Sequence, residues 1–574
     1  MSLIETFGWF LVLGIVALFG ASAVLRKPWW KRLWHPLSSF YDRLQAIHWV
    51  LAPFVMVVTL LAVPVVAYTL QSTSLVWLWI LMIVLFTALF LRSIKQSVQR
   101  IYQDRRYRKD LQNGLAINIS IAATGGNFGF LDRWAGSVSL PRRSILVAGA
   151  SGSGKTEVAI HFVQQMLFDH SSLMLVYDHK TDFQDFFDIL GVEYISISME
   201  DSTYIWNLFR EFDTEQDIDE FAQALFPEPS GGENDFFDDM ARQVFAACLK
   251  RLVRKREESD EFELSNASVR HYFQRNGADE IYEHLSEYSD LRAAASAIDV
   301  ETSPKQAQGV YASVQRIVNK VFIGDFGAAP PDGDGFSIRD HVRDPQGVPI
   351  VLDFPKATGQ STKPIFRFLI DHTAKHAMQN TDTYSYFILD EFAQIPHLRQ
   401  LEELVNVGRG DKVVTLVTLQ SVQQLYQNYG RNGGESILAG LVSMVLLRPN
   451  DSETAEFYRD AIGTKFVQHT NYVEEKWYGK RKEMKQSEQH IFATGDIRKW
   501  DPGVGVIVKQ AGWFFGYISM LTGDTMEVIA DVLSPTEHAG ALPERSITGE
   551  IEGTASSENQ DESDASSEQH VGTD

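Results

Sequence analysis

The sequence predicts an α/β core built around a phosphate-binding loop, with an all-helical domain inserted into it and transmembrane helices before it. Three observations predict this fold class. The apolar segment 145–148 leads into a complete phosphate-binding motif at 149–156. A second strand-like run, 387–389, ends at an acidic pair. Long apolar runs occupy most of residues 1–100 and are long enough to cross a bilayer as helices.

The amino-terminal region contains three apolar runs, Leu3–Leu25, Trp49–Leu70 and Leu75–Leu91. We predict that they form about three transmembrane helices in an anchor over residues 1–110. Lysines and arginines follow the first and third runs, so both flanks should be cytoplasmic and the N-terminus outside. Ala21–Ala23 could belong to a signal-peptidase site, but no positive charge precedes the first run, which favours a retained anchor. The protein is therefore expected to be a multi-pass protein of the cell (inner, cytoplasmic) membrane with cytoplasmic carboxyl-terminal domains.

The phosphate-binding motif is GASGSGKT, which matches the pattern GxxxxGK[ST] in full. Its glycines allow backbone N–H groups to surround a polyphosphate, and the helix expected to start near Lys155 adds its positive dipole end. Lys155 should reach the β- and γ-phosphates of ATP, and the Thr156 hydroxyl should bind Mg²⁺. The predicted nucleotide-binding residues are Gly149, Ala150, Ser151, Gly152, Ser153, Gly154, Lys155, Thr156 and Asp390.

The acidic pair after 387–389 supplies the remaining carboxylates. We predict that Asp390 binds Mg²⁺ through water and that Glu391 polarises the attacking water. Such a pair is by itself typical of a solvated strand end, but the complete phosphate loop upstream favours a functional interpretation. The expected cofactors are therefore ATP and Mg²⁺, with Thr156 and Asp390 as the metal-binding residues.

Two further residues are candidates for catalysis. Residues 413–419 have the pattern of a strand buried on both faces, and Gln420 follows at the carboxyl end, where parallel sheets bind ligands. Gln420 could sense the γ-phosphate or be an ordinary strand-end glutamine. Arg409 lies in a glycine-flanked loop and could stabilise the charge that develops during hydrolysis, although most loop arginines are merely solvated. The residue pattern alone leaves both alternatives open.

A change of sequence texture indicates an inserted domain. From about Phe212 strand-like runs become rare, while 235–255 and 303–322 repeat apolar residues at helical spacing. Strand-like sequence resumes at Val348, after a segment rich in glycine and proline. We therefore expect a helical domain between two parts of the α/β core.

The predicted boundaries follow from these changes and from the composition of the carboxyl-terminal end. Residues after Arg545 contain no Lys or Arg and are rich in Ser, Glu, Asp and Gly, which predicts disorder. This tail could be a solvating segment or an acidic docking peptide for a basic partner. The expected organisation is a nucleotide-binding domain at 111–212 and 341–545, an all-helical insertion at 213–340, and a disordered acidic tail at 546–574.

The charge balance restricts how nucleic acid could bind. The chain has 52 Lys plus Arg against 74 Asp plus Glu, a formal net charge of −22. Any contact with nucleic acid must therefore be local. The best candidate is 474–485, where five basic residues surround Trp477 and Tyr478 in a pattern that suits single-stranded DNA; a solvated hairpin tip is the alternative. Gly430–Ser436 is a second loop that could face a pore.

The single cysteine excludes an intramolecular disulfide and a cysteine-rich zinc site. Free cysteine is among the most buried residue types in proteins. We interpret Cys248 as a small residue of the hydrophobic core.

In their order along the chain, these motifs resemble a known family. The segments ILVAGASGSGKTE at 145–157, FILDEFAQI at 387–395 and GRGDKVVTLVTLQSVQQLYQNYG at 408–430 resemble the type IV secretion coupling proteins, the inner-membrane ATPases of conjugation. The resemblance covers roughly residues 110–530. Members typically have two membrane spans with a longer periplasmic segment between them, whereas three are predicted here.

The resemblance implies a RecA-like motor core with an all-helical insertion, assembling as a homo-hexamer around a channel. It implies that Gln420 senses the γ-phosphate and that Arg409 reaches into the site of a neighbouring subunit. The implied partners are single-stranded DNA or a relaxase–DNA complex, secretion-channel proteins and the membrane. The implied activity is ATP hydrolysis that drives DNA into the channel.

Two other functions remain open. One is a double-stranded DNA translocase for chromosome segregation or genome packaging. The other is a receptor that recruits secreted substrates and uses nucleotide mainly to assemble. Intact Glu391 and Gln420 argue against a receptor that has lost hydrolysis.

Overall fold

The structure is a computed structural model that describes residues 84, 105–125, 136–226, 235–258, 264–331, 333–354, 361–380, 382–395, 397–406, 410, 412–475, 479–509 and 512–518, with side chains described outside 125, 394 and 469–485. Two compact units divide the chain at Arg100 and Ile101. Apart from Val84, the three predicted membrane spans lie outside the described residues. Within the described part of the chain, no helix combines the length and apolar character that crossing a membrane requires.

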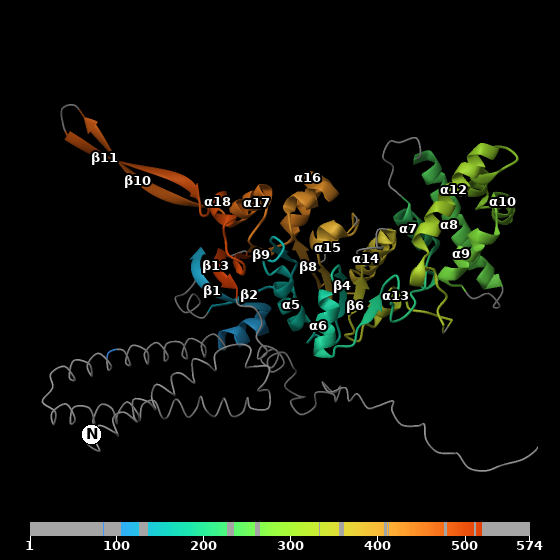
Figure 1. The fold of residues 1–574 in the computed structure, drawn as a ribbon, viewed down its shortest axis with the longest axis horizontal. Helices are drawn as coiled ribbons and strands as arrows, with labels where there is room; N and C mark the ends of the chain where they lie inside the picture. Colours follow the sequence, from blue (N-terminus) through green and yellow to red (C-terminus); the bar gives the residue numbers. More distant parts are fainter. Residues whose placement is uncertain are drawn as a thin grey trace, which may run out of the picture. The chain divides into compact units, whose positions relative to one another are not determined.

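An eleven-stranded mixed sheet forms the core of the second unit (Figure 1). Its strands follow the order β2-β1-β13-β12-β9-β3-β8-β7-β4-β6-β5. In this order, every neighbouring pair from β2 to β9 is antiparallel, and every neighbouring pair from β9 to β5 is parallel. The bounds are β1 Leu115–Gly125, β2 Ser137–Leu140, β3 Ile145–Ala148, β4 Leu173–Asp178, β5 Ile195–Ile197, β6 Ile350–Asp353, β7 Ser385–Leu389, β8 Val413–Leu419, β9 Ser443–Leu447, β12 Val504–Lys509 and β13 Gly512–Ile518.

Helices cover both faces of the parallel part of the sheet. Successive residues of β3 point to opposite faces, so Ile145 and Leu146 belong to different hydrophobic clusters. The cluster of Ile145 includes α5 (Lys155–Met166) and α6 (Asp182–Leu190). The cluster of Leu146 includes α14 (Lys363–Ala377), α15 (Leu401–Asn406), α16 (Val422–Gly440) and α17 (Ser452–Ile462), and α18 (Thr494–Ile497) adds Ile497. Because both faces are covered, β3 and β8 are buried along their whole length, as predicted for 413–419.

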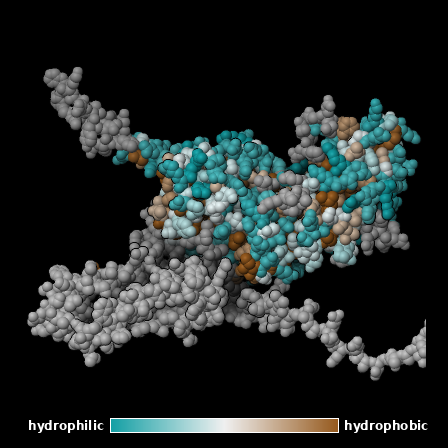
Figure 2. All heavy atoms as spheres, viewed as in Figure 1, coloured by the Kyte–Doolittle hydropathy of each residue, from teal (hydrophilic) through white to brown (hydrophobic). Residues whose placement is uncertain are grey.

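The described residues between β5 and β6 form helices, short 3₁₀ turns and one isolated bridge, Trp206–Phe336. The helices are α7 Glu215–Leu225, α8 Asp235–Glu258, α9 Asn266–Arg275, α10 Ala278–Ser286, α11 Arg292–Ala295, α12 Pro304–Val321 and α13 Ile338–Arg343. Cys248 on α8 is a free, fully buried thiol, which confirms its interpretation as a core residue. Most of the coloured surface in Figure 2 is hydrophilic, and one hydrophobic patch lies beside α6, the helix on which Ile189 is 82% exposed.

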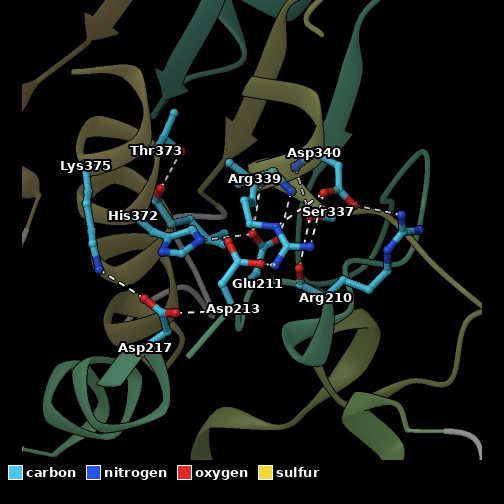
Figure 3. Close-up of polar contacts among 12 residues, drawn as sticks. Arg210, Glu211, Asp213, Asp217, Ser337, Arg339, Asp340, His372, Thr373 and Lys375 are labelled. Carbon is cyan, nitrogen blue, oxygen red and sulfur yellow. Dashed lines mark hydrogen bonds and ion pairs between the residues drawn. The ribbon is translucent and has the colours of Figure 1, made fainter. Parts of the chain in front are cut away.

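The chain leaves the sheet for the helical segment after β5 and returns to it before β6. A buried glutamate, Glu211, joins these two connections (Figure 3). Glu211 Oε1 accepts hydrogen bonds from Trp206 Nε1 at 2.9 Å and from the backbone N–H of Ile338 at 2.7 Å. Its Oε2 accepts from the backbone N–H of Arg339 at 3.0 Å and lies 3.1 Å from Nε2 of His372 on α14. Glu211 therefore caps the start of α13 and connects both of these chain segments to α14.

We expect Glu211→Ala to lower the free energy of unfolding by about 3 kcal/mol, because several buried donors would lose their acceptor. The matched control is Asp213→Ala, since Asp213 pairs with Arg339 and Arg343 but is 45% exposed. That control should cost less than about 1 kcal/mol. Denaturant unfolding followed by tryptophan fluorescence measures both, and equal effects would contradict the role of Glu211 at this junction.

The prediction of a loop at Gly430–Ser436 is wrong, because these residues lie within α16. The helix is kinked at Gly430, which has φ 68° and ψ 168°. Beyond the kink, Ile437 and Leu438 are buried, and this packing outweighs the low helix propensity of the glycines. At Gly434 a Cβ atom would lie 2.5 Å from Cδ1 of Tyr426, so the glycine permits close packing of the helix.

The basic segment 474–485 belongs to a two-stranded ribbon outside the main sheet. Strands β10 (Thr464–Glu475) and β11 (Gly479–His490) pair with each other in antiparallel register (Figure 1). A backbone hydrogen bond of 3.2 Å from Ile491 to Gly463 closes the base of the ribbon. The turn at 476–478 lies outside the described residues, so contact with DNA stays a prediction.

Candidate functional site

Apart from Arg409, the predicted site residues follow the carboxyl ends of the parallel strands β3, β7 and β8. The phosphate loop follows β3, which lies between β8 and β9. In the register of these pairs, Ala148 lies beside Leu419 of β8 and Leu446 of β9. Gln420, which follows Leu419, therefore lies next to the start of the phosphate loop, at the edge where parallel sheets bind ligands.

The phosphate loop is attached to the strands on both sides. Gly149 N–H donates to the carbonyl of Leu419 at 3.0 Å, and Ala150 N–H donates to the carbonyl of Arg448 at 2.7 Å. A Cβ atom on Gly149 would lie 2.8 Å from the Cβ of Leu447, so a larger residue does not fit there. These contacts define the conformation of the loop.

Helix α5 starts at Lys155, as expected. The preceding Gly154 has φ 99°, a left-handed conformation that favours glycine. The Lys155 side chain is buried, and its Nζ donates to the carbonyl of Ala150 at 3.1 Å. Burial lowers the pKa of Lys155, partly offset by nearby carboxylates. Thr156 is half-buried, while Ser151 and Gly152 are exposed at the loop surface.

The two acidic residues are held by one threonine hydroxyl. Thr418 Oγ1 donates to Asp390 Oδ1 at 2.7 Å and accepts the backbone N–H of Glu391 at 2.8 Å. Glu391 has φ 46° and ψ 46°, a left-handed conformation that costs about 1–3 kcal/mol in a non-glycine residue. Sequence reasoning missed Thr418; the signal was a polar residue inside an apolar strand.

The residues present fit a magnesium-bound polyphosphate. Burial raises the pKa of Asp390 to about 6, with partial relief from the Thr418 hydroxyl. Asp390 Oδ2 and Ser153 Oγ are buried without a hydrogen-bond partner among the described residues. No group of three or more His, Cys, Asp or Glu that could hold a metal occurs in the described ranges. Mg²⁺ commonly keeps several waters and uses one or two carboxylates, so this sparse protein ligand set is suitable.

The carboxylate of Glu391 is engaged by two side chains. Gln420 Nε2 donates to Oε1 at 2.6 Å and to Oε2 at 2.7 Å, and Lys180 Nζ pairs with Oε1 at 2.5 Å. Burial alone raises the pKa of Glu391, but the bonds from Lys180 and Gln420 outweigh it and hold that pKa below its usual range. The structure thus brings Gln420 to the acidic pair, while γ-phosphate sensing by Gln420 stays a prediction.

Lys180 is a site residue that sequence reasoning did not single out. It follows β4, and Asp178 at the end of that strand accepts backbone N–H groups from Lys180, Phe183 and Gln184 at 3.1, 2.9 and 3.1 Å. These bonds hold the turn into α6. The available signal was the polar stretch after a third buried strand of the same sheet.

Arg409 lies outside the described residues. The segment before it is anchored: Asp371 on α14 accepts the backbone N–H groups of Arg399 and Gln400 at 3.2 and 3.1 Å. Helix α15 then ends at Asn406. The role predicted for Arg409 therefore stays a prediction.

Comparisons with known proteins agree with the family resemblance of the sequence motifs. The family model described as the type IV secretion-system coupling protein DNA-binding domain matches residues 135–490. The chain is similar to coupling protein TraD of Escherichia coli (strain K12), at 22% identity over 344 residues, 58% of this chain and 45% of TraD. It is also similar to conjugal transfer protein TraG of Rhizobium radiobacter, at 24% identity over 250 residues, 42% of this chain and 38% of TraG. The chain thus spans less than half the length of these curated relatives.

Two solved structures share the fold. Bacterial conjugative coupling protein TrwBdeltaN70, in a form with sulphate, has a TM-score of 0.54 at 17% identity. The match covers 71% of this chain and 94% of the TrwBdeltaN70 chain. Plasmid coupling protein TrwB in complex with ADP and Mg²⁺ has a TM-score of 0.53 at 18% identity, with coverage of 67% and 88%. The predicted α/β core is thereby confirmed, while the transmembrane part of the fold prediction remains a prediction.

Proposed function

Because this chain belongs to the family of type IV secretion-system coupling proteins, we propose that it is a membrane-anchored, ATP-driven motor that couples a relaxase–DNA substrate to a secretion channel and pumps DNA across the membrane. One observation carries the proposal: a phosphate loop bonded to the strands on both sides, a buried aspartate with a free oxygen, and a glutamate paired with a glutamine lie at one sheet edge. This is the set of groups that hydrolysis of a nucleoside triphosphate needs.

Each residue has a definable task. The loop N–H groups and Lys155 would hold the polyphosphate, and Thr156 and Asp390 would hold Mg²⁺, which neutralises phosphate charge when bound. Glu391 would accept the proton of the attacking water, and Gln420 would report the γ-phosphate. That TrwB was solved with ADP and Mg²⁺ supports the same cofactors here.

The remaining parts of the proposal concern assembly and location. Residues 1–110 would anchor the protein in the cell (inner) membrane, leaving the sheet and helical segment in the cytoplasm. The subunits would form a homo-hexamer, so that an acidic protein could confine its basic residues to a central channel. The ribbon end at 474–485 is the proposed contact with single-stranded DNA, and secretion-channel proteins are the proposed partners at the membrane.

The direct test is Lys155→Ala. We expect ATP turnover to fall about a hundredfold to a thousandfold, because a buried cation at the phosphates would be lost. Lys412→Ala is the control, since Lys412 lies at the opposite, amino-terminal end of β8 and bonds the carbonyl of Asp382.

Turnover is measured with no DNA, with single-stranded DNA and with duplex DNA. Wild-type turnover in Lys155→Ala would contradict the proposed site. A wild-type protein that hydrolyses no ATP under any of these conditions would favour the receptor, and stimulation by duplex DNA alone would favour a segregation or packaging translocase.

A further inference from the structure

The glutamate proposed as the base is closed off in this structure. Its side chain is only 5% exposed, and both carboxylate oxygens accept hydrogen bonds from protein donors. Three such bonds use most of the roughly four acceptor positions of a carboxylate. A water poised for attack would therefore have to compete with Lys180 and Gln420 for Glu391.

The Lys180 ion pair is not needed to hold the local fold. The turn that carries Lys180 is already held by the three backbone hydrogen bonds to Asp178. The backbone of Glu391 is held separately by Thr418. Since both backbones have their own supports, the effect of the ion pair falls on the carboxylate of Glu391 itself.

The two donors also differ in what they can do. Gln420 lies directly before Ser421, the N-cap of α16, so its backbone is fixed. Lys180 has a longer side chain that is 33% exposed, so its ammonium group can exchange Glu391 for water at the surface. Lys180 can thus be released without moving the strands that bear the site.

We propose that Lys180 is a positioning residue that, together with Gln420, holds the carboxylate of Glu391 and so restrains hydrolysis until the substrate polymer engages the motor. This inference rests on the proposed function, because it concerns regulation of the same site. We call the contacts of Lys180 and Gln420 with Glu391 the Glu391 latch. Opening it requires Glu391 to exchange Lys180 for a water.

The experiment compares Lys180→Met, Lys180→Arg and the control Lys375→Met in the full chain in detergent. Lys375 is a matched control because it is 29% exposed and forms a similar ion pair, 3.0 Å from Asp217. Two readouts are taken. The first is carbodiimide labelling of Glu391 without nucleotide, located by mass spectrometry, with buried Glu211 at the junction of the helical segment as an internal reference. The second is the separate measurement of kcat and KM for ATP.

We expect Lys180→Met to increase labelling of Glu391 and to raise the DNA-free kcat about three- to fivefold with little change in KM. Stimulation by single-stranded DNA should fall correspondingly. Lys180→Arg should restore wild-type values because it keeps the cation, and Lys375→Met should match the wild type in both readouts.

The contrary outcomes are distinct. Unchanged labelling in Lys180→Met, or a kcat that falls, would overturn the Glu391 latch while leaving the motor in place. Increased labelling in a protein that never hydrolyses ATP would support the closed arrangement and overturn the motor. If Lys180→Met does not fold, Lys180→Gln provides the same comparison with a polar, uncharged side chain.

Discussion

Glu391→Gln is expected to lower ATP turnover about a hundredfold to ten-thousandfold, the usual contribution of a general base. Glutamine has the same size and can occupy the same left-handed backbone conformation, so the fold around Thr418 should remain. What it loses is the negative charge that accepts a proton from water. Nucleotide affinity should change little, because Glu391 is assigned to the reaction and not to binding.

The measurement separates these effects by combining steady-state turnover with binding of a fluorescent nucleotide. Glu220→Gln is the control, since Glu220 on α7 of the helical segment forms an ion pair with Lys375 of 2.8 Å. Turnover near the wild-type value in Glu391→Gln would show that another group accepts the proton. Loss of nucleotide binding would instead assign Glu391 to the ligand.

Arg409→Ala is expected to lower turnover of a homogeneous assembly about a thousandfold or more, as for other arginines that complete a neighbouring site. The anchoring of residues 399 and 400 by Asp371 gives the segment leading to Arg409 a fixed base on α14. In a ring, this arginine would serve the phosphate loop of the next subunit. A defect in one subunit can then be compensated by its neighbour.

Mixed assemblies test this arrangement. Arg409→Ala subunits keep Lys155, and Lys155→Ala subunits keep Arg409, so some interfaces of a mixed ring contain both intact residues. Turnover should therefore recover partly on mixing, although each variant alone is inactive. Arg431→Ala is the control, because Arg431 is 73% exposed and pairs with Glu435 on the same helix. Absence of recovery at every mixing ratio would place Arg409 outside the neighbouring site.

The candidate site could be predicted where its residues are contiguous in sequence. The phosphate loop, the strand before it and the acidic pair are local patterns, and the structure places them together at one edge of the sheet. The burial of β8 and of Cys248 also followed from residue type and pattern. The glycines of Gly430–Ser436 led to the wrong prediction of a loop, because glycine occurs at close packing contacts as well as in loops.

By itself, then, the sequence determined the strands and helices of the α/β core, its phosphate loop and its carboxylates, since these depend on patterns among residues near each other in the chain. The tertiary structure alone decided that Lys180 meets Glu391, 211 positions away, and that Thr418 orients Asp390. It also decided that the antiparallel strands β1, β2, β12 and β13 extend the parallel sheet beyond β9. The physical reason is strand order: which side chains share an edge depends on which strands pair, and pairing is set by packing of the whole sheet, not by local pattern.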